Sequence, residues 1–114
     1  MSSSVVFSGK MNDNNHMHDE NLYVCFPQGI ANGNVAYVLG TWTTTVEPPQ
    51  GKIVPLTLVG TCRFIAEKDF FIVKEGAYYR LKVNISGEKI DAMLVNKNDD
   101  PVSERSTLSK LSWI

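Results

Sequence analysis

The sequence predicts an all-β fold, an antiparallel sandwich or barrel of six to seven strands with one short C-terminal helix as an option. Three observations predict it: short runs alternate apolar and polar residues, turn-forming residues separate the runs, and no helical periodicity lies between them. The 114 residues are 43% hydrophobic and 20% charged, which fits one globular domain spanning residues 1–114.

The N-terminal part predicts one brief strand, a loop and a second strand. Val5-Val6-Phe7 is a short apolar run that suits a first strand. Residues 10–21 are polar, lack periodicity and predict a flexible polar loop within the domain. Residues 22–26 alternate two sets of mostly apolar side chains, which predicts a strand covered on both faces and ended by Pro27.

A hairpin and a long strand follow. Asn32-Gly33 is a pair that readily takes positive φ, and it predicts a hairpin turn into the next run. Residues 35–46 are rich in Val, Tyr, Trp and Thr, which favours a strand, with Gly40 at a bend, bulge or close approach. Two prolines and a glycine make residues 47–51 a loop.

Three runs in the middle of the chain predict further strands. Residues 53–66 alternate around Gly60, which mirrors Gly40, so we expect the two glycines to bend or pair together. Residues 70–73 are apolar throughout, as in a strand buried on both faces. Residues 77–85 alternate most clearly, with one apolar face and one wet face.

The last third predicts a second hairpin and leaves the C-terminus open. Ser86-Gly87-Glu88 connects to an alternating run at residues 90–95, which predicts that hairpin. After a polar loop, Ser103 suits the N-cap of a short helix in which Leu108 and Leu111 share a face. Residues 108–114 equally suit a final strand.

Charge and cysteine content narrow the setting. The net charge of −1 provides no overall field that would attract a polyanion or an anionic membrane. We find no signal-like start or apolar span, so we expect a cytoplasmic protein that does not enter a membrane. Cys25 and Cys62 are then expected to be reduced core thiols, with a cross-sheet disulfide as the alternative.

Residues for catalysis or metal binding are sparse. The only two histidines, His16 and His18, lie in the polar segment, far in sequence from either cysteine, so no nucleophile has an obvious base. A metal site there would need a third or fourth ligand from elsewhere, and we expect a solvated arm instead. The sequence therefore predicts a non-enzymatic protein without metal or other cofactor.

Two candidate ligand-binding surfaces stand out. Tyr78, Arg80 and Lys82 share one strand face, and such a mixture of an aromatic ring with cations is typical of OB-type barrels that bind single-stranded nucleic acid. The same residues also suit an ordinary wet face. Trp42, set among threonines, suits stacking on a sugar or another small ligand, or equally a core position.

The segment from Gly40 to Gly60 resembles part of a bacterial family of small β-domains without a known function. The similarity rests on six positions: Gly40, Thr43, Val46, Pro48, Pro49 and Gly60. It implies a β-fold of bacterial or phage origin and supplies no catalytic or binding residue. We therefore expect a binding or assembly module that self-associates through a strand edge or the threonine-rich face at residues 41–45.

Overall fold

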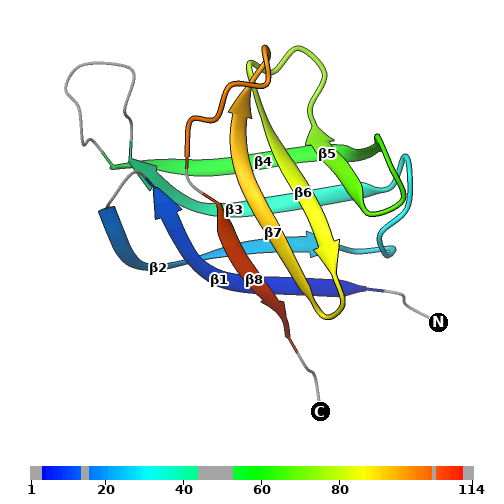
Figure 1. Ribbon diagram of the computed structural model, residues 1–114, viewed down its shortest axis with the longest axis horizontal. Helices are drawn as coiled ribbons and strands as arrows, with labels where there is room; N and C mark the ends of the chain where they lie inside the picture. The colour runs from blue at the N-terminus through cyan, green and yellow to red at the C-terminus, as the bar shows by residue number, and fades with distance from the viewer. Residues whose placement is uncertain (1–3, 14–15, 44–52, 104, 112–114) are drawn as a thin grey trace.

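Eight antiparallel strands follow one another around a closed barrel in the residues that the computed structural model describes, 4–13, 16–43, 53–103 and 105–111 (Figure 1). Each strand pairs with the next in sequence, and β8 returns to pair with β1. The strands are β1 (Val5–Asp13), β2 (His16–Phe26), β3 (Val35–Thr43), β4 (Ile53–Phe64), β5 (Asp69–Val73), β6 (Tyr79–Ser86), β7 (Lys89–Asn96) and β8 (Ser106–Lys110). The prediction of an all-β barrel is confirmed, with eight strands rather than six or seven.

The barrel consists of two halves whose strands cross. Strands β1–β4 run along the long axis of the molecule, and β6–β8 lie in front of them at a steep angle (Figure 1). At both places where the halves join, two strands approach closely at a glycine. A Cβ on Gly60 would lie 2.3 Å from the carbonyl oxygen of Val73, and one on Gly9 would lie 2.6 Å from that of Thr107. Only glycine allows these two corners to form.

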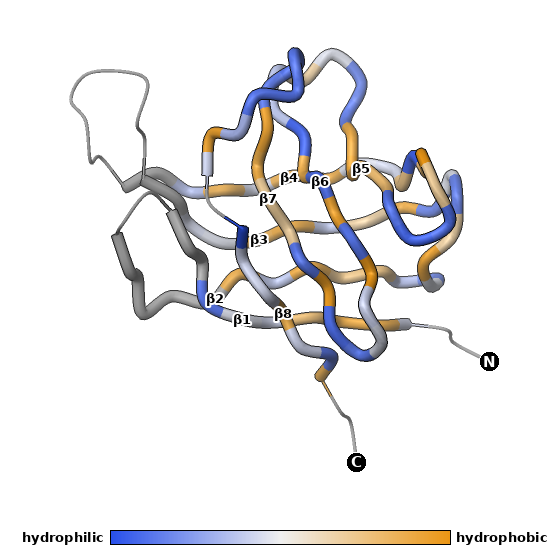
Figure 2. The backbone as a smooth tube through the Cα atoms, in the orientation of Figure 1, coloured by the Kyte–Doolittle hydropathy of each residue, from blue (hydrophilic) through white to orange (hydrophobic). Residues whose placement is uncertain are grey.

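Alternate residues of the strands fill the barrel. The core comprises Phe7, Leu22, Val24, Phe26, Ala36, Val38, Leu56, Leu58, Cys62, Phe70, Ile72, Leu81, Val83, Ile90, Ala92, Leu94, Val102 and Leu108. Phe26 contacts Phe7 and Phe70 edge-on, with ring centroids 6.0 and 5.9 Å away, and Phe64 stacks on Phe70 at 4.8 Å. Figure 2 shows apolar residues recurring along the strands, whereas the connection between β7 and β8 is hydrophilic. Burial of these alternating side chains stabilises the barrel.

The two predicted hairpins form, with different turns. Ser86 pairs with Lys89, so Gly87-Glu88 is a two-residue turn, and Gly87 takes φ +63°. Between β2 and β3 the connection spans residues 27–34, and Asn32-Gly33 is not a two-residue turn. There the Asn32 side chain accepts a hydrogen bond from the Phe64 N–H, and the Gly33 N–H donates to the Cys62 carbonyl. These contacts with β4, distant in sequence, determine the longer loop.

The structure corrects two expectations for local structure, a loop at residues 10–21 and a pairing of the two glycines, and decides the open choice at the C-terminus. Most of residues 10–21 continue β1 and begin β2 instead of forming a loop, because cross-strand pairing satisfies their backbone without an apolar pattern. Ser106–Lys110 form a strand rather than a helix, since β1 and β7 lie on either side. Gly40 pairs with Leu56 and Gly60 with Ala36, so the two glycines do not pair together.

The described residues contain no helix long and apolar enough to cross a membrane.

Candidate functional site

The half of the barrel formed by β1–β4 carries an outer surface without charge at its centre. Cross-strand pairing aligns two rows on it, Val6-Cys25-Tyr37-Val59 and Ser8-Tyr23-Leu39-Thr57. Val35 and Thr61 form a third pair beside them. We call these ten residues the uncharged face. Among the described residues pointing outward from these strands, the nearest cations are Lys10 on β1 and Arg63 on β4.

Large apolar side chains on the uncharged face are open to solvent. Five of them are between 42% and 53% exposed: Tyr23, Val35, Tyr37, Leu39 and Val59. They are adjacent across β2, β3 and β4, so they form one patch rather than scattered single positions. A contiguous exposed patch of this kind marks an interaction surface more often than single exposed residues do.

The expectation that residues 22–26 are covered on both faces is therefore wrong. Leu22, Val24 and Phe26 are buried in the barrel, but Tyr23 on the other face is 42% exposed. The strand therefore carries large side chains on both faces, but the fold of the single chain buries only the inner set.

The other half, β5–β8, covers its apolar outer residues with its own side chains and loops. Phe71 points outward from β5 but is only 7% exposed, because the Arg80 guanidinium lies 4.5 Å from its ring centroid and the Lys82 ammonium 6.0 Å. Val95 points outward from β7 and is fully buried, since the β7–β8 connection folds back and bridges it at Pro101. The prediction that β5 is buried on both faces is confirmed.

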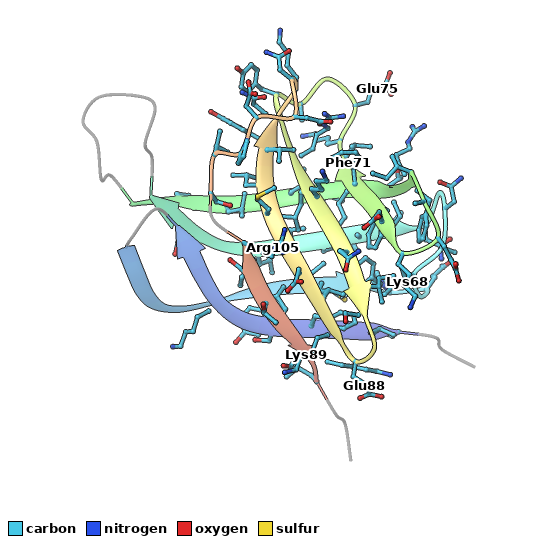
Figure 3. All side chains as sticks on the ribbon, viewed as in Figure 1. Lys68, Phe71, Glu75, Glu88, Lys89 and Arg105 are labelled. Atoms are coloured by element: carbon cyan, nitrogen blue, oxygen red, sulfur yellow. The ribbon has the colours of Figure 1, made fainter. Side chains whose placement is uncertain are left out.

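Polar groups on the outside of β5–β8 largely satisfy one another. Arg80 forms an ion pair with Asp99, Asn84 donates to Asp69, and the Thr107 hydroxyl donates to Asp91 at 2.8 Å. A shallow hollow of about 350 Å³ lies among them, lined by Asp69, Lys82, Val83, Asn84, Asp91, Ala92, Met93 and Arg105. Figure 3 shows Phe71 and the charged residues Glu75, Glu88, Lys89 and Arg105 on this half and its turns. We call this surface the charged face.

The predicted ligand-binding residues do not form one platform. Tyr78 precedes β6 and meets Tyr79 edge-on, with the Lys97 ammonium 5.6 Å from its ring centroid. Arg80 and Lys82 share the ring of Phe71 instead, and Arg80 is also paired with Asp99. Of the two predicted cations, Arg80 is paired with Asp99, and only Lys82 has no ion pair with a carboxylate of the described residues.

The remaining predicted positions are only partly described. Trp42 lies in β3 opposite Val54, and His16 and His18 lie in β2, but the side chains of all three fall outside the described residues. Of the threonine-rich segment 41–45, residues 44 and 45 and the side chain of Thr43 lie outside them as well. Within the described part of the chain, no three His, Cys, Asp or Glu side chains gather as metal ligands.

The two cysteines lie on opposite sides of the barrel wall. Cys25 is half-buried on the uncharged face, whereas Cys62 points into the core and is fully buried. Both thiols are free. Burial raises the pKa of the Cys62 thiol from 9.0 to about 11, because the interior solvates a thiolate poorly. Cys62 is therefore protonated at neutral pH and unsuited to act as a nucleophile.

Sequence reasoning did not identify Tyr23, Tyr37 or Leu39 as surface residues. The available signal was that both alternating sets in the β2 and β3 runs are apolar, which indicates a strand with two covered faces. That pattern does not reveal whether the second cover comes from the same chain or from another.

Comparison with known proteins finds no family model, curated protein or solved structure that matches the chain.

Proposed function

We propose that the protein is a non-enzymatic binding module that self-associates through the uncharged face. The observation that supports this most strongly is the patch formed by Tyr23, Tyr37 and Leu39 with Val35 and Val59, which lie adjacent and exposed on three neighbouring strands. Burial of such a patch against a second apolar surface is favourable. Aromatic residues are also enriched in interfaces, and two of the five are tyrosines.

A second copy of the chain is the partner that this surface suits best. A two-fold interface places the same patch against itself, so any charge at its centre would face a like charge. The uncharged face has none among its described residues, and flat sheet faces can pack against each other about 10 Å apart. A typical interface takes about 800 Å² from each partner, roughly an eighth of the 6927 Å² surface of the described chain.

The mass in solution tests this proposal. Sedimentation equilibrium over a wide concentration range should give a mass that rises from 12.7 kDa toward twice that value. Leu39→Lys places a cation at the centre of the patch, and we expect it to weaken association by at least about tenfold, because paired copies would desolvate like charges.

Asn98→Lys is the matched control for this substitution. It adds the same charge in the exposed β7–β8 connection, away from the uncharged face, and should leave association unchanged. A wild-type protein that stays monomeric at high concentration would end the proposal. Equal weakening by both substitutions would assign the effect to net charge rather than to the face.

Binding of single-stranded nucleic acid remains a weaker alternative. Arg80 is already paired with Asp99, and the described strands follow a meander order rather than the Greek-key order of a five-stranded OB barrel. A labelled oligonucleotide at low salt tests it by fluorescence polarisation. Binding that weakens with salt and on Lys82→Ala would favour this alternative.

A further inference from the structure

The barrel wall has an opening beside β4. Strand β5 pairs with β4 only from Thr61 to Phe64, and after Val73 the chain turns away into the β5–β6 connection. From Pro55 to Gly60, β4 pairs with β3 on one side and with no described strand on the other. A stretch of the β4 edge is therefore left without a described strand partner in the barrel wall.

The backbone groups along this edge follow from the direction of neighbouring hydrogen bonds. The Cys62 N–H donates to Asn34 on the β3 side, and the Ile65 N–H donates to Asp69 on the β5 side. Because successive residues of a strand alternate in direction, Leu56 and Leu58 bond to β3, whereas Thr57 and Val59 direct their N–H and C=O toward the opening. Pro55 shares this second direction, so its missing N–H costs no ladder bond.

A pocket of about 380 Å³ with both apolar and polar lining lies next to the edge. Its lining comprises Pro55, Leu56, Thr57, Leu58, Lys74, Ala77, Tyr78, Tyr79 and Leu94. Leu56, Leu58 and Leu94 belong to the barrel core and form an apolar floor. Lys74 is the only charged residue in the lining, so the pocket carries a cation and no carboxylate.

We propose that this opening binds a short extended peptide that adds a strand to β4 at Thr57 and Val59 and inserts one apolar side chain into the pocket. Alternating free N–H and C=O groups along an edge match the backbone of an extended peptide, which is how strand addition achieves affinity. The pocket selects the side chain, and Lys74 favours an acidic residue beside it. This binding does not depend on the proposed self-association, because it uses the backbone groups of Thr57 and Val59 and the pocket behind them, whereas self-association would use the outward side chains of the uncharged face.

Fluorescein-labelled peptides Glu-Val-X-Val-Glu, with X as Ala, Leu, Ile, Phe, Tyr or Trp, are the probes. We expect saturable binding of at least one apolar X below about 1 mM, with Ala weakest because it leaves the pocket empty. The same peptide N-methylated on its valine nitrogens should not bind, because it cannot donate to β4. Amide exchange by NMR should slow at Thr57 and Val59 on binding, while Leu56 and Leu58 are protected beforehand.

Thr57→Pro tests the edge in the protein itself. It removes one free N–H without breaking the β3–β4 ladder, as Pro55 already does two residues earlier, and should weaken binding by about three- to tenfold. Thr57→Val keeps the N–H and should bind like the wild type. No binding by any peptide, or equal binding by the N-methylated form, would overturn the proposal. Protection of Thr57 and Val59 on concentrating the Leu39→Lys protein alone would also overturn it, because a second copy would then occupy the edge without using the uncharged face.

Discussion

The uncharged face and the charged face belong to the same barrel wall but handle apolar outer residues differently. On the charged face, Phe71 is covered by Arg80 and Lys82, and Val95 by the connection through Pro101. On the uncharged face, Tyr37 and Leu39 have no such cover and are 43% and 53% exposed. One half of the molecule thus covers its apolar outer residues, and the other leaves them exposed to solvent.

The difference arises from what each strand carries at its outward positions. In β6 those positions hold Arg80, Lys82 and Asn84, whose long or polar side chains can lie over an aromatic ring and still reach water. In β3 they hold Val35, Tyr37 and Leu39, which cannot. Long cationic side chains are therefore the means by which this small barrel covers Phe71 on its outside.

The joints between the two halves should produce the largest effect. Gly60→Ala and Gly9→Ala should each destabilise the protein by about 3 kcal/mol, because the added Cβ meets backbone atoms of the other half. Chemical denaturation measures this. Gly76→Ala is the control: its Cβ would meet nothing within 4 Å, and its φ of +78° predicts a cost of only about 1 kcal/mol. Equal costs at all three positions would show that the corners can relax.

The buried thiol of Cys62 should make the stability of the protein depend on pH. The unfolded Cys62 thiol loses its proton near pH 9.0, whereas the folded one keeps it until about pH 11, so unfolding releases a proton in that interval. Stability should fall by about 2 kcal/mol between pH 9 and 11 through this group. Cys62→Ala should lack that part of the pH dependence, while Cys25→Ala should retain it. Parallel curves for wild type and Cys62→Ala would contradict the prediction.

The self-covering of the charged face should contribute a smaller amount. Arg80→Ala removes both the ion pair with Asp99 and the contact with the Phe71 ring, and we expect a loss of about 1 kcal/mol. In a double-mutant cycle, Arg80→Ala should cost about 0.5 kcal/mol less in the Asp99→Ala background than in the wild type, because the ion pair is already absent there. Substitutions that prove strictly additive would mean that the pair does not hold Arg80 over Phe71.

Salt should produce the smallest effect if the uncharged face is the interface. The dissociation constant of the self-associated protein should change less than about twofold between low and high NaCl, because no charges pair across that surface. Sedimentation equilibrium at several salt concentrations measures it. A severalfold weakening of association by salt would indicate that the interface lies on the charged face instead.

Much of the fold could be predicted from short-range patterns. The predicted runs at residues 53–66, 70–73 and 90–95 agree closely with the bounds of β4, β5 and β7. They were predictable because buried strand positions require apolar residues in a local pattern. The strands within residues 10–21 were missed, and the choice between helix and strand at the C-terminus stayed open, because both segments form strands by pairing with neighbours. The choice between sandwich and barrel depended on the β1–β8 closure, which joins the two ends of the chain.

Less of the candidate site could be predicted. Arg80 and Lys82 were identified as outward residues. Their partners were not, because the Phe71 ring and the Asp99 carboxylate come from other parts of the chain. Tyr37 and Leu39 resembled core residues, because an apolar side chain has the same sequence signature whether its cover is present or missing. The opening beside β4 left no signal, since it depends on where β5 ends.

The sequence by itself determined which side chains point into the barrel, because alternation is a property of adjacent residues and survives any arrangement of strands. Only the tertiary structure decided which outward residues are covered and where the wall stays open. Those outcomes depend on the crossing of strands at Gly9 and Gly60 and on the register of partners far apart in the chain. The local sequence pattern thus specified the core, and long-range geometry specified which outward side chains and strand edges stay exposed.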